Sequence, residues 1–140
     1  MRILGLDIGD KRVGVAISDP EEIIASPLTV ITRDNDSSTI DTIVRLMGQY
    51  DVKLIVVGLP YSLDGSLGRQ ASKVKDFVDK LSQNTSAGIE LWDERLSTVA
   101  VERLLRGAGN KKARERSRLD AAAAAFILQG YLDSLKVCDQ

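Results

Sequence analysis

The hydrophobic pattern at the start of the chain is that of β-strands. Residues 3–8 are apolar except for Asp7, and the polar stretch 9–12 that follows begins with a glycine, which readily supplies the positive φ of a tight turn. Apolar and small residues alternate over 13–17, which indicates a second strand. A third strand is expected at 23–31, where an internal proline favours an edge position. Three short strands in succession predict an antiparallel meander.

Helical and strand patterns alternate after this meander. Apolar positions recur at helical spacing up to Tyr50, behind a polar segment in which Asp36, Ser37 or Ser38 could be the N-cap. The later elements are expected in this order: a buried strand at 52–58, a helix around 71–81, a strand at 88–94, a helix after Ser97 or Thr98, and a last helix from about Ser117 to Leu135. This alternation requires the later strands to pair in parallel.

These patterns together predict an α/β fold. Its sheet is mixed and five-stranded, with three antiparallel strands followed by parallel ones, and helices cover its faces. The 140 residues are enough for one domain with a substantial core, and residues 1–140 are expected to form it.

The composition narrows the possible chemistry. The chain has no histidine, which removes Ser–His and Cys–His catalysis and histidine metal ligands. Its single cysteine, Cys138, cannot form an internal disulfide, so a reducing, cytoplasmic setting is expected. No apolar run approaches the roughly 20 residues of a membrane span and no signal peptide is visible, so no membrane partner is expected. Catalysis would therefore use carboxylates, other polar side chains or a hard metal ion.

Asp7 is the first candidate for such chemistry. With the strand period of two it shares a face with Ile3, Gly5 and Gly9, and this nearly bare face would let another group approach the carboxylate. A carboxylate in an apolar strand is costly to bury without a partner. Asp7 is therefore either the first ligand of an acidic metal site or an acid at a strand end that accepts N–H bonds from the turn.

Asp120 is the second candidate. It lies near the start of the last helix, on the apolar face formed by Ala123, Ala124, Ile127, Leu128 and Tyr131. The alternative is structural, because the segment from Ser117 to Asp120 fits a capping box, in which the acid bonds back to the cap backbone.

Asp93 and Glu94 end the fifth strand. Sites in sheets with parallel members form beyond the carboxyl ends of the strands. Successive strand residues face opposite ways, so only one of the two acids is expected at a site. The alternative is a solvated strand end at which one acid pairs with Arg95.

The combination of three separated acidic positions favours a metal site. Clustered carboxylates repel one another unless a cation lies between them, and all-oxygen ligands suit Mg²⁺ or Mn²⁺. Two such ions about 4 Å apart can activate water and stabilise the leaving oxygen in phosphodiester cleavage. The expected catalytic residues and metal ligands are thus Asp7, one of Asp93 and Glu94, and Asp120.

Basic residues near these acids could hold a phosphate backbone. A basic segment precedes Asp120 and contains one acid, Glu115; it lacks clear periodicity and is expected to be a surface loop. The candidate nucleic-acid contacts are Lys11, Arg12, Arg95, Lys111, Lys112, Arg114, Arg116 and Arg118.

The sequence resembles the bacterial YqgF family, also called RuvX, over nearly its whole length. The resemblance rests on several motifs in order: Gly5-Leu-Asp7-Ile-Gly9, Lys11-Arg12-Val-Gly14, Ser18-Asp19-Pro20, Val57-Gly58-Leu-Pro60, Asp64-Gly65-Ser66, Trp92-Asp93-Glu94-Arg95, Asp120-Ala-Ala-Ala-Ala and Ile127-Leu128-Gln129. It implies an RNase H-like fold and metal-dependent phosphodiester hydrolysis, with trimming of the 5′ end of the 16S rRNA precursor as the proposed role. It also implies that Asp7, the Asp93–Glu94 pair and Asp120 are the family's acids. Of the pair we favour Glu94, so that Asp7, Glu94 and Asp120 are the expected metal ligands.

Several functions remain open at this stage. The first is an endonuclease acting on pre-16S rRNA or a pre-ribosomal particle, as a monomer or weak homodimer. Its close variant is a resolvase of branched DNA, such as a Holliday junction. A phosphotransferase of the actin-like type would need a second similar half, which 140 residues without a repeat do not supply. A non-catalytic RNA-binding assembly factor would use the same basic residues.

Overall fold

The structure, a computed structural model, describes residues 2–9, 11–59, 69–93 and 113–138. The elements in these ranges are β1 (Arg2–Ile8), β2 (Arg12–Ser18), β3 (Ala25–Thr32), α1 (Asp36–Tyr50), β4 (Val52–Leu59), α2 (Arg69–Ser82), β5 (Gly88–Asp93) and α4 (Ala113–Cys138). The helix predicted after Ser97 or Thr98 lies outside them. No helix within them combines the length and apolar character needed to cross a membrane.

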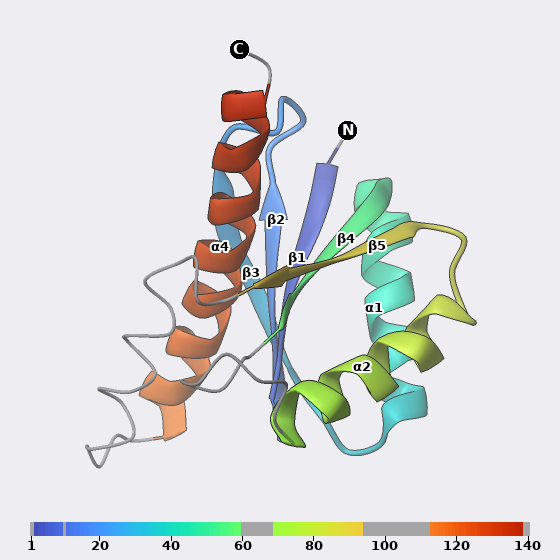
Figure 1. The fold of residues 1–140 in the computed structure, drawn as a ribbon. Helices are drawn as coiled ribbons and strands as arrows, with labels where there is room; N and C mark the ends of the chain where they lie inside the picture. Colours follow the sequence, from blue (N-terminus) through green and yellow to red (C-terminus); the bar gives the residue numbers. More distant parts are fainter. Residues whose placement is uncertain (1, 10, 60–68, 94–112, 139–140) are drawn as a thin grey trace.

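The five strands form one mixed sheet in the order β3-β2-β1-β4-β5 (Figure 1). β1 pairs antiparallel with β2, and β2 pairs antiparallel with β3. β4 pairs parallel with β1 on its other side, and β5 pairs parallel with β4. The predicted α/β fold, with a meander followed by parallel strands, is therefore confirmed.

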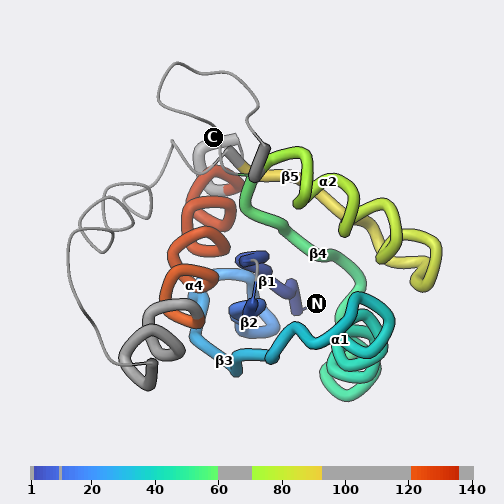
Figure 2. The backbone as a smooth tube through the Cα atoms, turned by 90° about the horizontal axis from the view of Figure 1, so that it is seen from below, coloured from blue at the N-terminus to red at the C-terminus, as the bar shows by residue number. Residues whose placement is uncertain are grey.

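Helices cover both faces of the sheet. α1 and α2 lie on one face, and α4 lies on the other, which the end-on view shows most clearly (Figure 2). Each face has its own apolar core. The core under α1 and α2 includes Leu4, Leu6, Val13, Val15, Ile43, Ile55 and Phe77. The core under α4 includes Ile3, Ala16, Val56, Ala124, Ile127 and Leu128.

β1 sits at the centre of the sheet and contributes to both cores by alternation. Leu4, Leu6 and Ile8 are buried on the side of α1 and α2. Ile3 is buried under α4, so the period of two assigns Gly5 and Asp7 to the same side. The predicted face of Asp7 is thus the face that α4 covers.

Two predicted boundaries were wrong for local reasons. The third strand begins at Ala25 because the N–H groups of Ile23 and Ile24 bond to Asp19 Oδ1, at 2.7 and 2.9 Å, and so belong to the preceding turn. The predicted edge position of this strand is confirmed. The N-cap of α1 is Asn35 rather than one of the three residues after it, because Asn35 has extended backbone and its Oδ1 accepts the N–H of Ser38 at 2.8 Å.

The last helix begins earlier than predicted. α4 starts at Ala113, so residues 113–118 of the basic segment are helical and not a loop. Alanine, arginine and glutamate are strong helix formers, and no glycine or proline interrupts this stretch. Because four residues of helix precede Ser117, that residue is not an N-cap and the capping-box reading of Asp120 is wrong.

Candidate active site

Asp7 is one of three buried polar residues among those that the structure describes. Asp7 lies at the carboxyl end of the central strand, and only 6% of its surface is exposed to solvent. It shares the face under α4 with Ile3, whose surface is fully buried. A carboxylate at such a depth requires compensation by hydrogen bonds or by a cation.

Glycines surround Asp7 on its own face of the sheet. Gly14 pairs with it directly on β2. Leu6 pairs with Val57 on β4, so the register continued by one residue brings Gly58 to its other side. Gly5 precedes it by one strand period on β1. No side chain therefore flanks Asp7 at Gly14 or Gly58, whereas the position above Gly5 is taken up by α4.

Gly5 marks the closest approach of α4 to the sheet. A Cβ placed on Gly5 would lie 2.8 Å from Cβ of Leu128 and 3.1 Å from the carbonyl oxygen of Ala124. Both of these atoms belong to the helix backbone or are attached directly to it. The separation of α4 and β1 therefore depends on the absence of a side chain at this position.

The position of the Asp120 backbone relative to Asp7 can be derived from this contact. α4 runs in the opposite direction to β1 (Figure 1). From Gly5 to Asp7 the strand advances by about 6.7 Å, and from Ala124 back to Asp120 the helix advances by about 6 Å. The turn of α4 that carries Asp120 therefore lies beside the part of β1 that carries Asp7. The side chain of Asp120 is outside the described set.

The register of β5 assigns Trp92 and Asp93 to opposite faces of the sheet. Trp92 pairs with Gly58 and packs into the core under α4. Asp93 pairs with Leu59, which belongs to the core on the other face. β5 lies two strands from β1, a spacing of about 10 Å between backbones. The side chain of Asp93 and all of Glu94 lie outside what the structure describes.

The basic candidates fall into three groups. Lys11 is exposed and Arg12 is half-buried in the turn after Asp7, at the same end of the sheet. Three arginines occupy the first turns of α4, without described side chains: Arg114, Arg116 and Arg118. The remaining three candidates lie outside the described residues: Arg95, Lys111 and Lys112.

The described side chains do not by themselves assemble a metal site. Among them, no group of three or more acidic, histidine or cysteine side chains is close enough to hold a metal ion. Asp7 is the only predicted ligand whose side chain belongs to this set.

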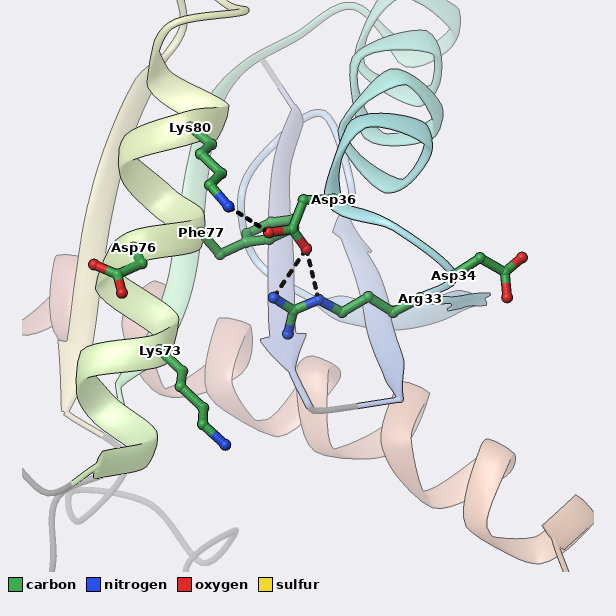
Figure 3. Close-up of a pocket in the computed structure, with 7 residues that line it drawn as sticks. All are labelled: Arg33, Asp34, Asp36, Lys73, Asp76, Phe77 and Lys80. Carbon is green, nitrogen blue, oxygen red and sulfur yellow. Dashed lines mark hydrogen bonds and ion pairs between the residues drawn. The ribbon is translucent and has the colours of Figure 1, made fainter.

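Sequence reasoning missed Arg33, which contacts the turn after Asp7. Its Nη1 donates to the carbonyl oxygen of Gly9 at 2.9 Å. Its guanidinium also bonds to Asp36, at 3.0 Å from Nη2 and 3.1 Å from Nε. Arg33 and Asp36 border an open pocket between α1 and α2 with a volume of about 370 Å³ (Figure 3). Arg33 had no local signal, because its partner Gly9 is 24 residues away in sequence.

An aromatic pair joins β5 to α4. The rings of Trp92 and Tyr131 meet edge to face, with centroids 5.9 Å apart. Burial, followed by a hydrogen bond with Glu90, raises the pKa of Tyr131 to about 12. A Cβ on Gly130 would lie 3.2 Å from Nε1 of Trp92, so this glycine allows the indole to sit against the helix.

The arrangement is that of an RNase H-like fold, with an acid on the central strand beneath a covering helix. Solved structures with this architecture include RuvC of T. thermophilus in complex with a Holliday junction substrate, at a TM-score of 0.62 and 15% identity, covering 97% of this chain and 96% of that one. The Fowlpox virus resolvase in complex with Holliday junction DNA matches at a TM-score of 0.55 and 15% identity, covering 96% and 99%. At such identities the similarity concerns the fold alone.

Sequence comparison then gives the family. The family model "RuvX: Holliday junction resolvase" matches residues 1–134, and the chain belongs to this family. A Clostridium botulinum protein named "Putative pre-16S rRNA nuclease" is 44% identical over 135 residues, which are 96% of this chain and 98% of that protein. A protein of the same name from Thermoanaerobacter pseudethanolicus is 46% identical over 137 residues, covering 97% and 99%. The resemblance seen in the sequence is confirmed.

Proposed function

We propose that this chain is a nuclease that hydrolyses phosphodiester bonds with Mg²⁺ or Mn²⁺ held by Asp7, Glu94 and Asp120. The observation that carries the proposal is the buried carboxylate of Asp7 on a face cleared by glycines, beside the turn of α4 that bears Asp120. A space lined by carboxylate oxygens suits a hard, oxygen-liganded cation.

The choice of Glu94 over Asp93 rests on strand alternation. Trp92 packs on the face under α4, and Asp93 is paired with a residue of the opposite face. One further residue of regular strand would return Glu94 to the face of Asp7. The three ligands then come from a central strand, an outer strand and the helix across them.

The bound metal would supply the activated water and the stabilisation of the leaving oxygen. The chain's own residues would bind and orient the substrate. Lys11 and Arg12 follow Asp7 at the same end of the sheet, where they can contact phosphates on one side of the scissile bond. The arginines at the start of α4 can contact phosphates on the other side.

The proposed substrate is the 16S rRNA precursor, at its 5′ end, in the cytoplasm. The rRNA precursor as substrate is supported by relatives of nearly equal length, 44–46% identical, whose names read "Putative pre-16S rRNA nuclease". A second candidate is a four-way DNA junction, which the description of the family model favours. We propose that residues 1–140 form a single domain, which acts as a monomer or weak homodimer. No membrane partner is proposed.

Cleavage assays can separate these functions. The wild-type chain, with Mg²⁺, with Mn²⁺ or with EDTA, is given a precursor rRNA fragment and a four-way DNA junction at matched salt. Metal-dependent cleavage is expected, faster on the RNA. Asp7→Asn should abolish it, because the amide keeps the shape but loses the negative charge. Asp41→Asn, at an exposed position of α1, is the matched control and should cleave normally.

The outcomes are decisive in each direction. RNA binding without cleavage in any metal would refute the nuclease and favour a non-catalytic binding role. Cleavage of the junction but not of the RNA would indicate that the substrate is branched DNA. Undiminished cleavage by Asp7→Asn, in a protein with a wild-type circular dichroism spectrum, would refute the role of the buried carboxylate.

A further inference from the structure

Arg33 holds the turn that follows Asp7 from the outside. Its Nη1 donates to the carbonyl oxygen of Gly9, and its backbone N–H donates to the carbonyl oxygen of Lys11, both at 2.9 Å. The turn is also closed internally, because the N–H of Gly9 donates to the carbonyl oxygen of Arg12 at 2.8 Å. The turn after Asp7 is thus fixed by three hydrogen bonds, two of which are made by Gly9.

The guanidinium is itself anchored to both helices on the opposite face of the sheet. Asp36, in the first turn of α1, accepts its Nε and Nη2. Its central carbon lies 5.0 Å from the centroid of the Phe77 ring on α2, a cation–π distance. Lys80, also on α2, donates to the other carboxylate oxygen of Asp36 at 2.8 Å (Figure 3). The side chain of Arg33 is 15% exposed, so solvent competes little with these bonds.

We propose that Arg33 is a positioning residue for the metal-binding carboxylate of Asp7. This inference rests on the proposed nuclease function and deepens it. Gly5 fixes the strand behind Asp7 through its contact with α4, and Arg33 fixes the turn ahead of it through Gly9. The backbone on either side of Asp7 is therefore restrained from both faces of the sheet, and this fixes the point from which the carboxylate projects.

The planar fork of arginine is what this role requires. Arg33 bonds at once to a backbone carbonyl and to a carboxylate in different directions. A lysine keeps the positive charge but presents a single ammonium group, which cannot span both acceptors in the same geometry. Arg33→Lys therefore removes the restraint on the turn while leaving the net charge unchanged.

The test measures Mn²⁺ binding to the protein without nucleic acid, by electron paramagnetic resonance. Arg33→Lys is expected to bind Mn²⁺ about tenfold more weakly, at the lower end of the effects seen when groups that orient metal ligands are removed. On the RNA substrate, kcat should fall while KM stays near the wild-type value, because the charge near the substrate is preserved. Asp36→Asn, which frees the guanidinium from α1, should weaken Mn²⁺ binding in the same direction.

A core variant controls for general loss of stability. Val74→Ala removes buried methyl groups of α2 from the same core without touching the turn. It should lower the Tm yet bind Mn²⁺ like the wild type at a temperature where both proteins are folded. Weaker Mn²⁺ binding by Arg33→Lys but not by Val74→Ala supports positioning.

The two proposals fail in different ways. If the wild type does not bind Mn²⁺, or Asp7→Asn binds it equally well, the metal site itself is wrong. If the wild type binds Mn²⁺ and Asp7→Asn does not, while Arg33→Lys and Asp36→Asn both keep wild-type affinity, only the role of Arg33 is refuted. Equal weakening in Val74→Ala and Arg33→Lys would likewise refute it.

Discussion

Substituting Gly5 by alanine should disturb the candidate site without altering any of its functional groups. The added Cβ would stand 2.8 Å from Cβ of Leu128, where ordinary carbon–carbon contacts need about 3.5–4.0 Å. It would also stand 3.1 Å from the carbonyl oxygen of Ala124. Because neither atom can rotate away, α4 must move from β1 by up to about 1 Å.

The size of the effect follows from this displacement. Overpacking of a well-packed core costs about 1–3 kcal/mol, which in a domain of this size corresponds to a fall in Tm of roughly 3–12 °C. A shift of about 1 Å between Asp7 and the turn that carries Asp120 is expected to lower kcat about 100-fold. Calorimetry measures the first effect, and cleavage of the precursor RNA fragment measures the second.

A second glycine supplies the matched control. Gly48 is exposed in α1, and a Cβ there would meet nothing within 4 Å. Gly48→Ala should therefore stabilise the protein by about 0.5–1 kcal/mol, as alanine does in a helix interior, and leave cleavage unchanged. A wild-type Tm for Gly5→Ala would refute the close contact with α4. A lowered Tm with an undiminished rate would show that the spacing of α4 and β1 does not set the geometry of the site.

Three further substitutions test separate parts of the structure. Asn35→Ala removes the N-cap of α1 and should cost about 1 kcal/mol in chemical denaturation, with cleavage unchanged; a neutral result would contradict the capping bond. Gly130→Ala should displace the indole of Trp92, the single tryptophan, and shift its fluorescence emission to longer wavelength. Tyr131 keeps its proton in the folded state up to pH about 12, whereas in the unfolded chain it ionises near 10.0, so stability should fall as the pH rises between these values. Alkaline unfolding of Tyr131→Phe should lack this loss, and identical curves would refute the raised pKa.

The sheet could be predicted from sequence because its signals are local. Alternation over 13–17 and the apolar run at 52–58 identify an antiparallel and a buried parallel strand without knowledge of their partners. The same period of two assigned Asp7 to the glycine-bearing face of β1. That face is confirmed as the one under α4 by the burial of Ile3 in the core beneath this helix.

Other features depend on competition or on distant contacts, and these were missed. Several adjacent polar residues could cap α1. The carboxylate of Asp36 does not serve as the cap because it bonds to Lys80 and Arg33 instead. The hydrogen bond from Lys80, and then that from Arg33, hold the pKa of the Asp36 carboxyl below its ordinary value of 3.8. The start of α4 has helix propensity without apolar periodicity, so a search for periodicity stops too late. The link from Arg33 to Gly9 joins elements that no local pattern connects.

The distribution of glycines bears on the two readings of Asp7 that the sequence left open. An acid that only accepts N–H bonds from a turn needs donors beside it, and side chains at the neighbouring strand positions would not disturb it. Here Gly14 and Gly58 remove those side chains on the two neighbouring strands, while Gly5 admits α4, although each glycine in a strand interior weakens the sheet. A cost of this kind at both flanking positions is expected where something other than a side chain must reach the carboxylate. The metal ion and phosphate that we propose at Asp7 would meet that requirement.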